Sequence, residues 1–160
     1  MKASRISAWL ALALLGASGS GLAQDVTYRK DIKPLIDTKC AGCHGANSPT
    51  LAEFAIDQKK YMATMKGPRM DTYADLLMIV GWTDTGAIMR RLDDGKNELA
   101  GGKPGNMYQY LGATEEERQA GLKTFKAWVG EGGWNLNRFS ARGTVPGITK
   151  EQMEKIQVKY

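Results

Sequence analysis

The sequence predicts an all-α protein with few helices and long loops, and three observations lead to this fold class. Apolar residues recur at helical spacing in several separate segments. One of these segments opens with a capping box, which marks the start of a helix. The two cysteines are not surrounded by the runs of β-branched residues that a βαβ unit would contain. A single small domain built from helices accounts for all three observations.

The first residues predict an exported protein. Lys2 and Arg5 precede a short apolar run over residues 8–17, and small residues then lead to Ala23. This order is typical of a secretory signal peptide, here residues 1–23 with cleavage after Ala23. The run is about half as long as the roughly 20 apolar residues that cross a bilayer. We therefore expect a mature chain located in the periplasm, with no transmembrane segment.

The composition does not favour a nucleic-acid-binding function. The formal net charge is +5 over 160 residues, and Lys2 and Arg5 would leave with the signal peptide. Basic and acidic residues alternate along the remaining chain, so the sequence shows no basic patch of the kind that binds nucleic acid. The remaining chain is long enough for one domain with a modest core.

The first expected helix leads into the cysteines. Asp31 is a candidate N-cap, and Pro34 then falls in the first turn, where its missing N–H costs little. Ile32, Leu35 and Ile36 follow at helical spacing. We expect this helix to bury its apolar face and to run directly into the segment that carries the soft ligands of the chain.

Both cysteines and the only histidine fall within five residues, as Cys40, Cys43 and His44. Disulfides are common in exported proteins, but a bridge between these cysteines would close a very small ring and connect no distant segments. A redox Cys-x-x-Cys motif belongs in a βαβ context, which the sequence does not predict here. Cys-x-x-Cys-His is the attachment motif of a c-type haem, and this interpretation uses all three residues.

The chemistry of haem attachment explains the spacing. Each thiol adds to one vinyl group of the porphyrin, so Cys40 and Cys43 would hold the ring through two thioethers. The imidazole of His44 then lies close enough to become the proximal iron ligand. Because the motif occurs once, the sequence predicts one haem c per chain and excludes a multihaem protein.

Two further helices are expected in the middle of the chain. Apolar residues recur at helical spacing over residues 73–80, and this helix should stop at Gly81. A second periodic stretch begins at about Thr85 and ends near Gly95. A glycine-rich loop over residues 95–105 follows and leads to the last helix.

The chain has no second histidine, so methionine is the expected sixth ligand of the iron. Of the eight methionines, two lie in helical stripes and are expected in the core. Met107 stands at the end of the glycine-rich loop, which could lay the thioether across the haem face opposite His44. We therefore favour Met107 as the axial ligand. Met70 is the alternative, in a polar stretch that also contains Met62 and Met65.

The best-marked helix spans residues 114–129. Thr114 and Glu117 form its capping box, and large apolar residues give it a buried stripe. Gly121 lies inside this helix at a cost of about 1 kcal/mol against alanine, which suggests that another segment passes close to it. Residues 134–160 form a polar extension with one short helix near its end, and we expect it to contribute little to the main core.

These parts, in this order, resemble the class I c-type cytochromes. In that family an N-terminal helix runs into Cys-x-x-Cys-His, a loop methionine closes the haem site, and a C-terminal helix packs across the first. Cys40, Cys43 and His44 match the motif, and Met107 matches the ligand loop. The Pro-Thr-Leu sequence that begins at Pro49 resembles the Pro-x-Leu element of the family. This resemblance implies that the Pro49 carbonyl accepts a hydrogen bond from His44.

The resemblance covers residues 28–131 and implies a cytochrome c-like fold wrapped around one covalent haem. It implies an electron carrier rather than an enzyme. We expect a haem domain over residues 24–133, and the extension over residues 134–160 is a candidate partner-docking segment. Lysines that rim the haem edge would steer an acidic redox partner, and the candidates are Lys33, Lys39 and Lys103. Two alternatives remain open: a haem subunit docked on an oxidoreductase, and a five-coordinate haem for ligand binding or catalysis.

Overall fold

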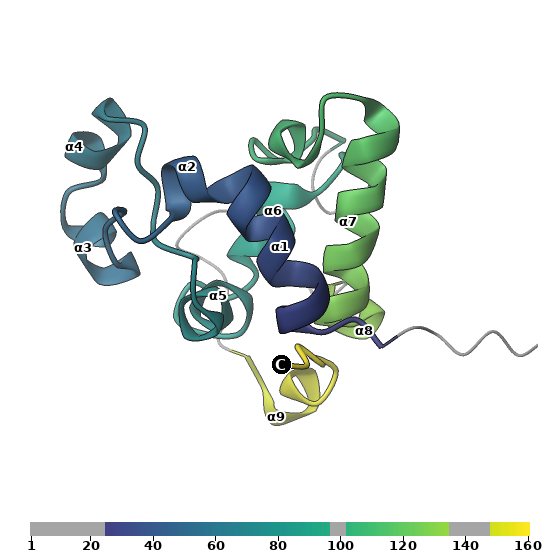
Figure 1. Cartoon of the computed structure of the whole chain (residues 1–160). Helices are drawn as coiled ribbons and strands as arrows, with labels where there is room; N and C mark the ends of the chain where they lie inside the picture. The colour runs from purple at the N-terminus through teal and green to yellow at the C-terminus, as the bar shows by residue number, and fades with distance from the viewer. Residues whose placement is uncertain (1–24, 97–101, 135–147) are drawn as a thin grey trace, which may run out of the picture.

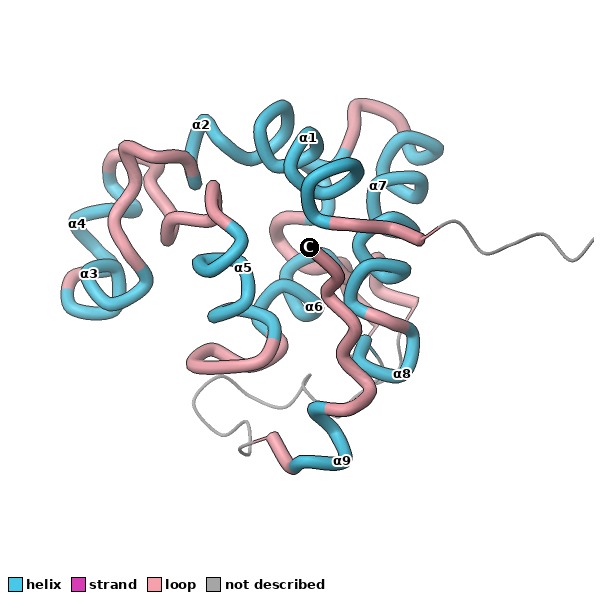
Figure 2. The backbone as a smooth tube through the Cα atoms, turned by 60° about the horizontal axis from the view of Figure 1, so that its bottom comes forward, coloured by secondary structure: helices cyan, strands magenta, loops and turns pink. Residues whose placement is uncertain are grey.

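The described part of the chain is helical. The computed structural model describes residues 25–96, 102–134 and 148–160, and these ranges contain helices and loops but no strand (Figure 2). The predicted all-α class is confirmed. The α-helices are α1 (Lys33–Leu35), α2 (Ala41–His44), α3 (Leu51–Ile56), α4 (Gln58–Ala63), α5 (Tyr73–Val80), α6 (Ala87–Leu92), α7 (Glu115–Val129), α8 (Glu131–Trp134) and α9 (Lys150–Met153). The other described elements are two π-helical segments, η1 (Tyr28–Ile32) and η2 (Ile36–Cys40), and the 3-10 helix η4 (Tyr108–Leu111).

One nearly continuous helix runs from Tyr28 to His44 through η1, α1, η2 and α2, and we call it the N-terminal helix. Its N-cap is Thr27 and not Asp31, so the predicted cap was wrong. The Thr27 side chain accepts a hydrogen bond from the Lys30 N–H at 3.3 Å. The Asp31 carboxylate accepts one from the Thr27 N–H at 2.9 Å. Asp31 therefore supports the cap from within the first turn, where its charge also complements the helix dipole.

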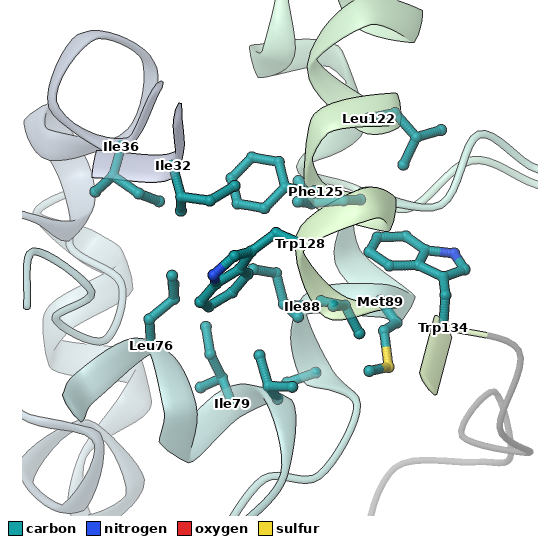
Figure 3. Close-up of a cluster of buried hydrophobic side chains, with 14 of the residues drawn as sticks. Ile32, Ile36, Leu76, Ile79, Ile88, Met89, Leu122, Phe125, Trp128 and Trp134 are labelled. Carbon is teal, nitrogen blue, oxygen red and sulfur yellow. The ribbon is translucent and has the colours of Figure 1, made fainter. Parts of the chain in front are cut away.

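The two middle helices lie close to where the sequence predicted them. The Thr72 side chain caps α5 by accepting a hydrogen bond from the Asp75 N–H at 3.2 Å, and α5 ends at Gly81 as expected. α6 begins at Ala87, slightly later than predicted, because Gly86 before it has a left-handed backbone with φ of 73°. The buried side chains of both helices meet those of α7 (Figure 3).

α7 is the longest of the described helices and begins at the predicted cap. Thr114 Oγ1 accepts a hydrogen bond from the Glu117 N–H at 3.2 Å. The Glu117 carboxylate, however, accepts from the Ala113 N–H at 2.8 Å, so the capping box is shifted by one residue on that side. A Cβ atom on Gly121 would lie 3.4 Å from the Leu111 Cβ. The expectation that another segment passes close to this glycine is confirmed.

The core forms where α7 crosses the N-terminal helix. Phe125 and Trp128 of α7 lie against Ile32 and Ile36, and all four side chains are buried (Figure 3). Burying a large apolar side chain stabilises the fold by about 1.5–3 kcal/mol relative to leaving it exposed. This crossing therefore fixes the position of the helix that ends in the haem motif.

Helices α3 and α4 stand apart from this core (Figure 1). They lie in the chain between His44 and α5, and neither contains a buried residue. Sequence analysis missed them because they are short and have no long apolar period. Side-chain caps start both helices. Thr50 and Glu53 form a complete capping box, and the Asp57 side chain accepts a hydrogen bond from the Lys60 N–H at 3.0 Å.

The end of the chain packs on the core, so the expectation that the extension contributes little to it was wrong. The Val158 N–H donates to the Trp128 carbonyl oxygen at 2.9 Å. The Lys159 carbonyl oxygen accepts from the Tyr28 N–H at 2.8 Å and from Trp128 Nε1 at 2.9 Å. Figure 2 shows this stretch running from α9 to the C-terminus beside the N-terminal helix. The polar sequence concealed the packing because much of the attachment uses backbone groups, which every residue carries.

Tyr160 completes this attachment. Its ring centroid lies 5.7 Å from that of Tyr28 and 4.9 Å from that of Tyr73. The Arg29 guanidinium carbon lies 4.4 Å from the centre of the Tyr160 ring. The Tyr73 hydroxyl donates to the Val158 carbonyl oxygen at 2.7 Å. The C-terminal residues therefore tie the N-terminal helix, α5 and α7 to one another.

We expect removal of residues 157–160 to destabilise the holoprotein by about 3 kcal/mol or more. The deletion removes several hydrogen bonds worth roughly 0.5–1.5 kcal/mol each, together with the aromatic contacts of Tyr160. Thermal unfolding should shift down by about 10 °C. Lys159→Ala is the control, because it removes only an exposed ion pair with Asp25 and should cost less than about 1 kcal/mol. Equal stability of the shortened and full-length proteins would contradict this structural role.

Two organisational predictions concern residues that the structure does not describe. The signal peptide over residues 1–23 lies outside the described residues, and so do residues 135–147 at the start of the extension. The boundary between residues 133 and 134 stays a prediction. The short helix expected near the end of the extension is present as α9, which Thr149 caps.

Candidate haem site

The haem motif lies at the end of the N-terminal helix. Cys40 ends η2, and Cys43 and His44 end α2. Residues three and four positions apart in a helix share one face, so this helix brings both thiols and the imidazole together. Both cysteines are free and half-buried. The structure therefore gathers the three motif residues at one site, as the sequence predicted.

The environment of the cysteines does not resemble that of a redox Cys-x-x-Cys pair. Burial, followed by the proximity of Cys43, raises the pKa of the Cys40 thiol to about 11. This thiol is therefore protonated at neutral pH. Reactive thiols of disulfide oxidoreductases instead have lowered pKa values. The local chemistry thus disfavours the redox interpretation of the motif.

The imidazole of His44 is held by Pro68 and not by Pro49. His44 Nδ1 donates to the Pro68 carbonyl oxygen at 2.7 Å, whereas the Pro49 carbonyl oxygen accepts from the Arg69 N–H at 2.7 Å. The prediction that Pro49 fixes the imidazole was therefore wrong. Because a carbonyl oxygen only accepts, this bond assigns the proton to Nδ1 and leaves the Nε2 lone pair for a metal. No hydrogen bond reaches Nε2 from the residues that the structure describes.

The protonation state of His44 also suits a metal ligand. Burial lowers the pKa of the imidazole, the hydrogen bond to Pro68 acts in the opposite direction, and the charge of Arg91 lowers the pKa further. The net direction is downward, so the ring is neutral at pH 7. Neutral imidazole is the form that binds a metal ion.

A short segment from Gly67 to Met70 brings Pro68 to the motif. The Gly67 N–H donates to the Cys43 carbonyl oxygen at 2.9 Å, and the Met70 N–H donates to the His44 carbonyl oxygen at 2.8 Å. Gly67 has to lack a side chain, because a Cβ atom would lie 2.1 Å from His44 Cε1. Sequence reasoning missed the roles of Gly67 and Pro68. The Gly-Pro dipeptide was their only signal, and Pro68 follows His44 by 24 residues.

We expect Gly67→Ala to disrupt the haem site, because the added methyl group would overlap the His44 imidazole. Moving the ring or the supporting segment should cost about 1–3 kcal/mol, as overpacking of a core does. The variant should incorporate less haem and unfold at a lower temperature. Gly42→Ala is the matched control, since no atom of the described residues, apart from its chain neighbours and the backbone of its own helix, lies within 4 Å of its Cβ position. If both variants took up haem like the wild type, the proposed contact would be absent.

The structure places the two candidate methionine ligands on different segments. Met107 immediately precedes η4, and its N–H donates to the Arg91 carbonyl oxygen at 3.0 Å. η4 contacts η2, which ends at Cys40. Met70 is bonded through its N–H to His44, on the segment that supports the imidazole. Both methionine side chains are half-buried and pack at the edge of the core.

The residues present fit a covalent c-type haem. The motif offers two half-buried thiols on one helix face and a neutral imidazole with Nε2 available, which is the donor set that such a haem uses. Within residues 25–96, 102–134 and 148–160, no group of three or more His, Cys, Asp or Glu side chains could hold a metal ion directly. An iron bound at His44 would take its remaining nitrogen ligands from a porphyrin.

The helical fold and the haem motif define a mono-haem c-type cytochrome. The sequence matches the family described as PccH cytochrome c over residues 27–160, and the chain belongs to that family. It is also similar to a solved structure, that of the monoheme cytochrome PccH from Geobacter sulfurreducens. The sequence identity is 54% and the TM-score is 0.73, and the match covers 85% of this chain and 99% of that chain. No curated protein matches the sequence.

Membership of this family confirms three predictions. The protein is a c-type cytochrome, its fold is all-α and cytochrome c-like, and it carries one haem c per chain. The family match also extends to residue 160, so the C-terminal segment that packs on the core belongs to the family sequence.

Proposed function

We propose that this cytochrome is an exported electron carrier in which Cys40 and Cys43 hold the haem and His44 and Met107 ligate its iron. The role in electron transfer is supported by membership of a monohaem cytochrome family. The observation that carries the residue assignment is the hydrogen bond between His44 Nδ1 and the Pro68 carbonyl oxygen. This bond orients a neutral imidazole with its other nitrogen ready for iron.

Met107 is the better candidate for the sixth ligand because Met70 lies on the same segment that supports the His44 imidazole. Met70 is two residues from Pro68, and its N–H is bonded to the His44 carbonyl oxygen. This segment is hydrogen-bonded to His44 and supports its imidazole, whereas the sixth ligand would have to come from a different segment. Met107 comes from a separate stretch beside η4, which contacts the motif helix. The geometry therefore favours Met107.

The bound haem would supply a one-electron iron couple, and the protein would tune and position it. The Pro68 bond makes the His44 imidazole more basic and fixes the plane of its ring. The buried crossing of α7 and the N-terminal helix holds the motif rigidly. If His44 and Met107 both ligated the iron, no coordination site would be open to a substrate. Such a centre would transfer electrons rather than catalyse a reaction on a bound substrate.

The periplasmic location forms part of the proposal and depends on the sequence. Residues 1–23 have the basic, apolar and small-residue order of a secretory signal. In the part of the chain that the structure describes, no helix is both long enough and apolar enough to cross a membrane. A covalently held cofactor also suits an exported protein, because the haem cannot be lost by simple dissociation.

We also propose redox partners with acidic surfaces. The three lysines that the sequence suggested for this role, Lys33, Lys39 and Lys103, are not equivalent in the structure. Lys33 forms an ion pair with Asp37 at 2.6 Å, which reduces the charge that it can offer to a partner. Lys39 and Lys103 are exposed. We propose the docking role of the extension only for the residues that precede residue 157. Residues 157–160 are hydrogen-bonded to the core helices.

Expression with the native leader, followed by voltammetry, tests the proposed function. The exported holoprotein should begin at Gln24 and show one reversible one-electron couple. The ferrous protein should bind carbon monoxide slowly or not at all, because both axial positions are occupied. Rapid carbon monoxide binding by the wild type would instead indicate a five-coordinate haem. Purification in a fixed ratio with an oxidoreductase would favour the docked-subunit alternative.

A further inference from the structure

Residues 51–66 form an arm whose only contact with the hydrophobic core, among the described residues, is the half-buried side chain of Leu51 at its start. The arm consists of α3, α4 and the turn that follows them, and every residue in it is exposed or half-buried. It projects away from the remaining helices (Figure 1). Phe54 and Tyr61 stack within it at 6.3 Å between ring centroids, so the arm has its own small internal contact. Its role therefore lies on the surface of the protein.

The arm exposes three large apolar side chains. Ile56 is 86% exposed, Met62 64% and Met65 74%. Single exposed apolar residues are ordinary, but three on one short projection, none of which packs on the core, are not explained by folding. Methionine is also an adaptable side chain that suits surfaces which bind and release partners.

Positive charge accompanies these apolar residues. The arm contains three basic residues, Lys59, Lys60 and Lys66, and two acidic residues, Glu53 and Asp57, which take part in the caps of α3 and α4. Arg69, which follows the arm, forms an ion pair with Asp71. All three lysines lie on α4 and the turn after it, together with Met62 and Met65, whereas both acids precede α4. A partner complementary to α4 and this turn would be acidic around an apolar centre.

The arm is attached directly to the haem motif. Lys66 Nζ donates to the Gly42 carbonyl oxygen at 2.9 Å, and the Gly67 N–H donates to the Cys43 carbonyl oxygen at 2.9 Å. Gly42 lies between the two cysteines of the motif. A protein that docked on the arm would therefore lie beside the segment that holds the haem.

We propose that the arm, residues 51–66, is the docking surface for an electron-transfer protein whose contact face has an acidic rim and an apolar centre. This inference rests on the proposed function, and it places the docking site on the arm and not on Lys33, Lys39 and Lys103. Ile56, Met62 and Met65 form the apolar centre of the contact. The lysines of the arm steer the partner during encounter, which makes the association rate depend on ionic strength.

One-electron reduction of the ferric holoprotein by a purified acidic flavodoxin in its hydroquinone form, which becomes the semiquinone, tests this surface when it is followed by stopped-flow absorbance. Lys59→Glu with Lys60→Glu should lower the second-order rate constant by about tenfold or more at low salt, and the difference should shrink at high salt. Met62→Ser with Met65→Ser should lower the rate constant by about fivefold at any ionic strength, since it removes apolar contact and no charge. Reduction by dithionite at high salt should stay within about twofold of wild type in both variants, since such a small reductant needs no docked complex.

Two variants elsewhere on the surface are the controls. Lys123→Glu with Lys150→Glu makes the same change in net charge away from the arm and should change the flavodoxin rate by no more than about twofold to threefold. If it slowed the reaction as much as the arm variants, only net charge would matter and the docking surface would be refuted. If Lys39→Glu with Lys103→Glu lowered the rate constant for reduction by flavodoxin as much or more, the docking site would lie at those lysines and the proposal would be overturned.

Other occupants of the arm give different results. A wild-type dimer in sedimentation equilibrium that Met62→Ser with Met65→Ser abolishes would show that a second copy covers the arm. Binding to anionic phosphatidylglycerol vesicles that the same variant abolishes, together with an unchanged flavodoxin rate, would show a membrane contact. Either result overturns the proposal. A reversible haem couple with unchanged flavodoxin kinetics in the arm variants would refute the arm alone, whereas absence of that couple in the wild type would refute the electron-carrier function.

Discussion

The double variant Cys40→Ala with Cys43→Ala should lack covalent haem and should not reach the native fold. Without thioethers the haem would be held only by its axial ligands and would be lost during export. The half-buried apolar residues at the edge of the core, among them Met70 and Met107, would then lack the ring that we expect them to contact. Because the cofactor binds only the folded state, its binding free energy is part of the folding free energy.

Haem staining after denaturing electrophoresis and far-ultraviolet circular dichroism measure the two parts of this result. The single variants Cys40→Ala and Cys43→Ala are the controls, because each retains one thioether and should still carry some covalent haem. The wild type should keep its haem in the aqueous phase during extraction with acidified organic solvent. Release of haem into the organic phase by the wild type would show that the attachment is not covalent.

The variant Met107→Ala should open the sixth coordination position of the iron. Loss of the thioether should abolish the long-wavelength charge-transfer band of the ferric iron–methionine bond and allow rapid binding of carbon monoxide or imidazole. The reduction potential should fall by something on the order of 0.1 V, because a thioether favours ferrous iron more than water or hydroxide does and axial ligands span about 0.8 V. Optical spectroscopy and voltammetry of the purified holoprotein measure these changes.

Met70→Ala is the matched comparison for this assignment. Met70 is bonded to His44 through its backbone N–H, which alanine retains, so this variant should keep the charge-transfer band and the potential of the wild type. It should lose some stability, about 2 kcal/mol, because a half-buried side chain at the edge of the core is removed. Loss of the band in the Met70 variant and its retention in the Met107 variant would reverse the ligand assignment.

Local patterns predicted the parts of this protein that depend on neighbouring residues. The haem motif was identifiable because two thiols and an imidazole need a fixed spacing to serve one porphyrin, and a helix preserves that spacing. α7 was identifiable because its cap and apolar stripe lie within 16 residues of each other, from Thr114 to Val129. The small helices α3 and α4 were missed because they are short, contain no fully buried residue and so have no apolar period.

The sequence by itself determined the cofactor, the helical class and the identity of the covalent and proximal residues proposed here. The tertiary structure decided which carbonyl oxygen holds His44 and what the C-terminal residues do. Pro68 reaches the imidazole across two inserted helices, and the Lys159 carbonyl oxygen reaches both Tyr28 and Trp128. The acceptors in these contacts are backbone oxygens, which nearly every residue offers equally. Which one is used depends on where the packed core brings the chain together, and no local pattern of side chains records it.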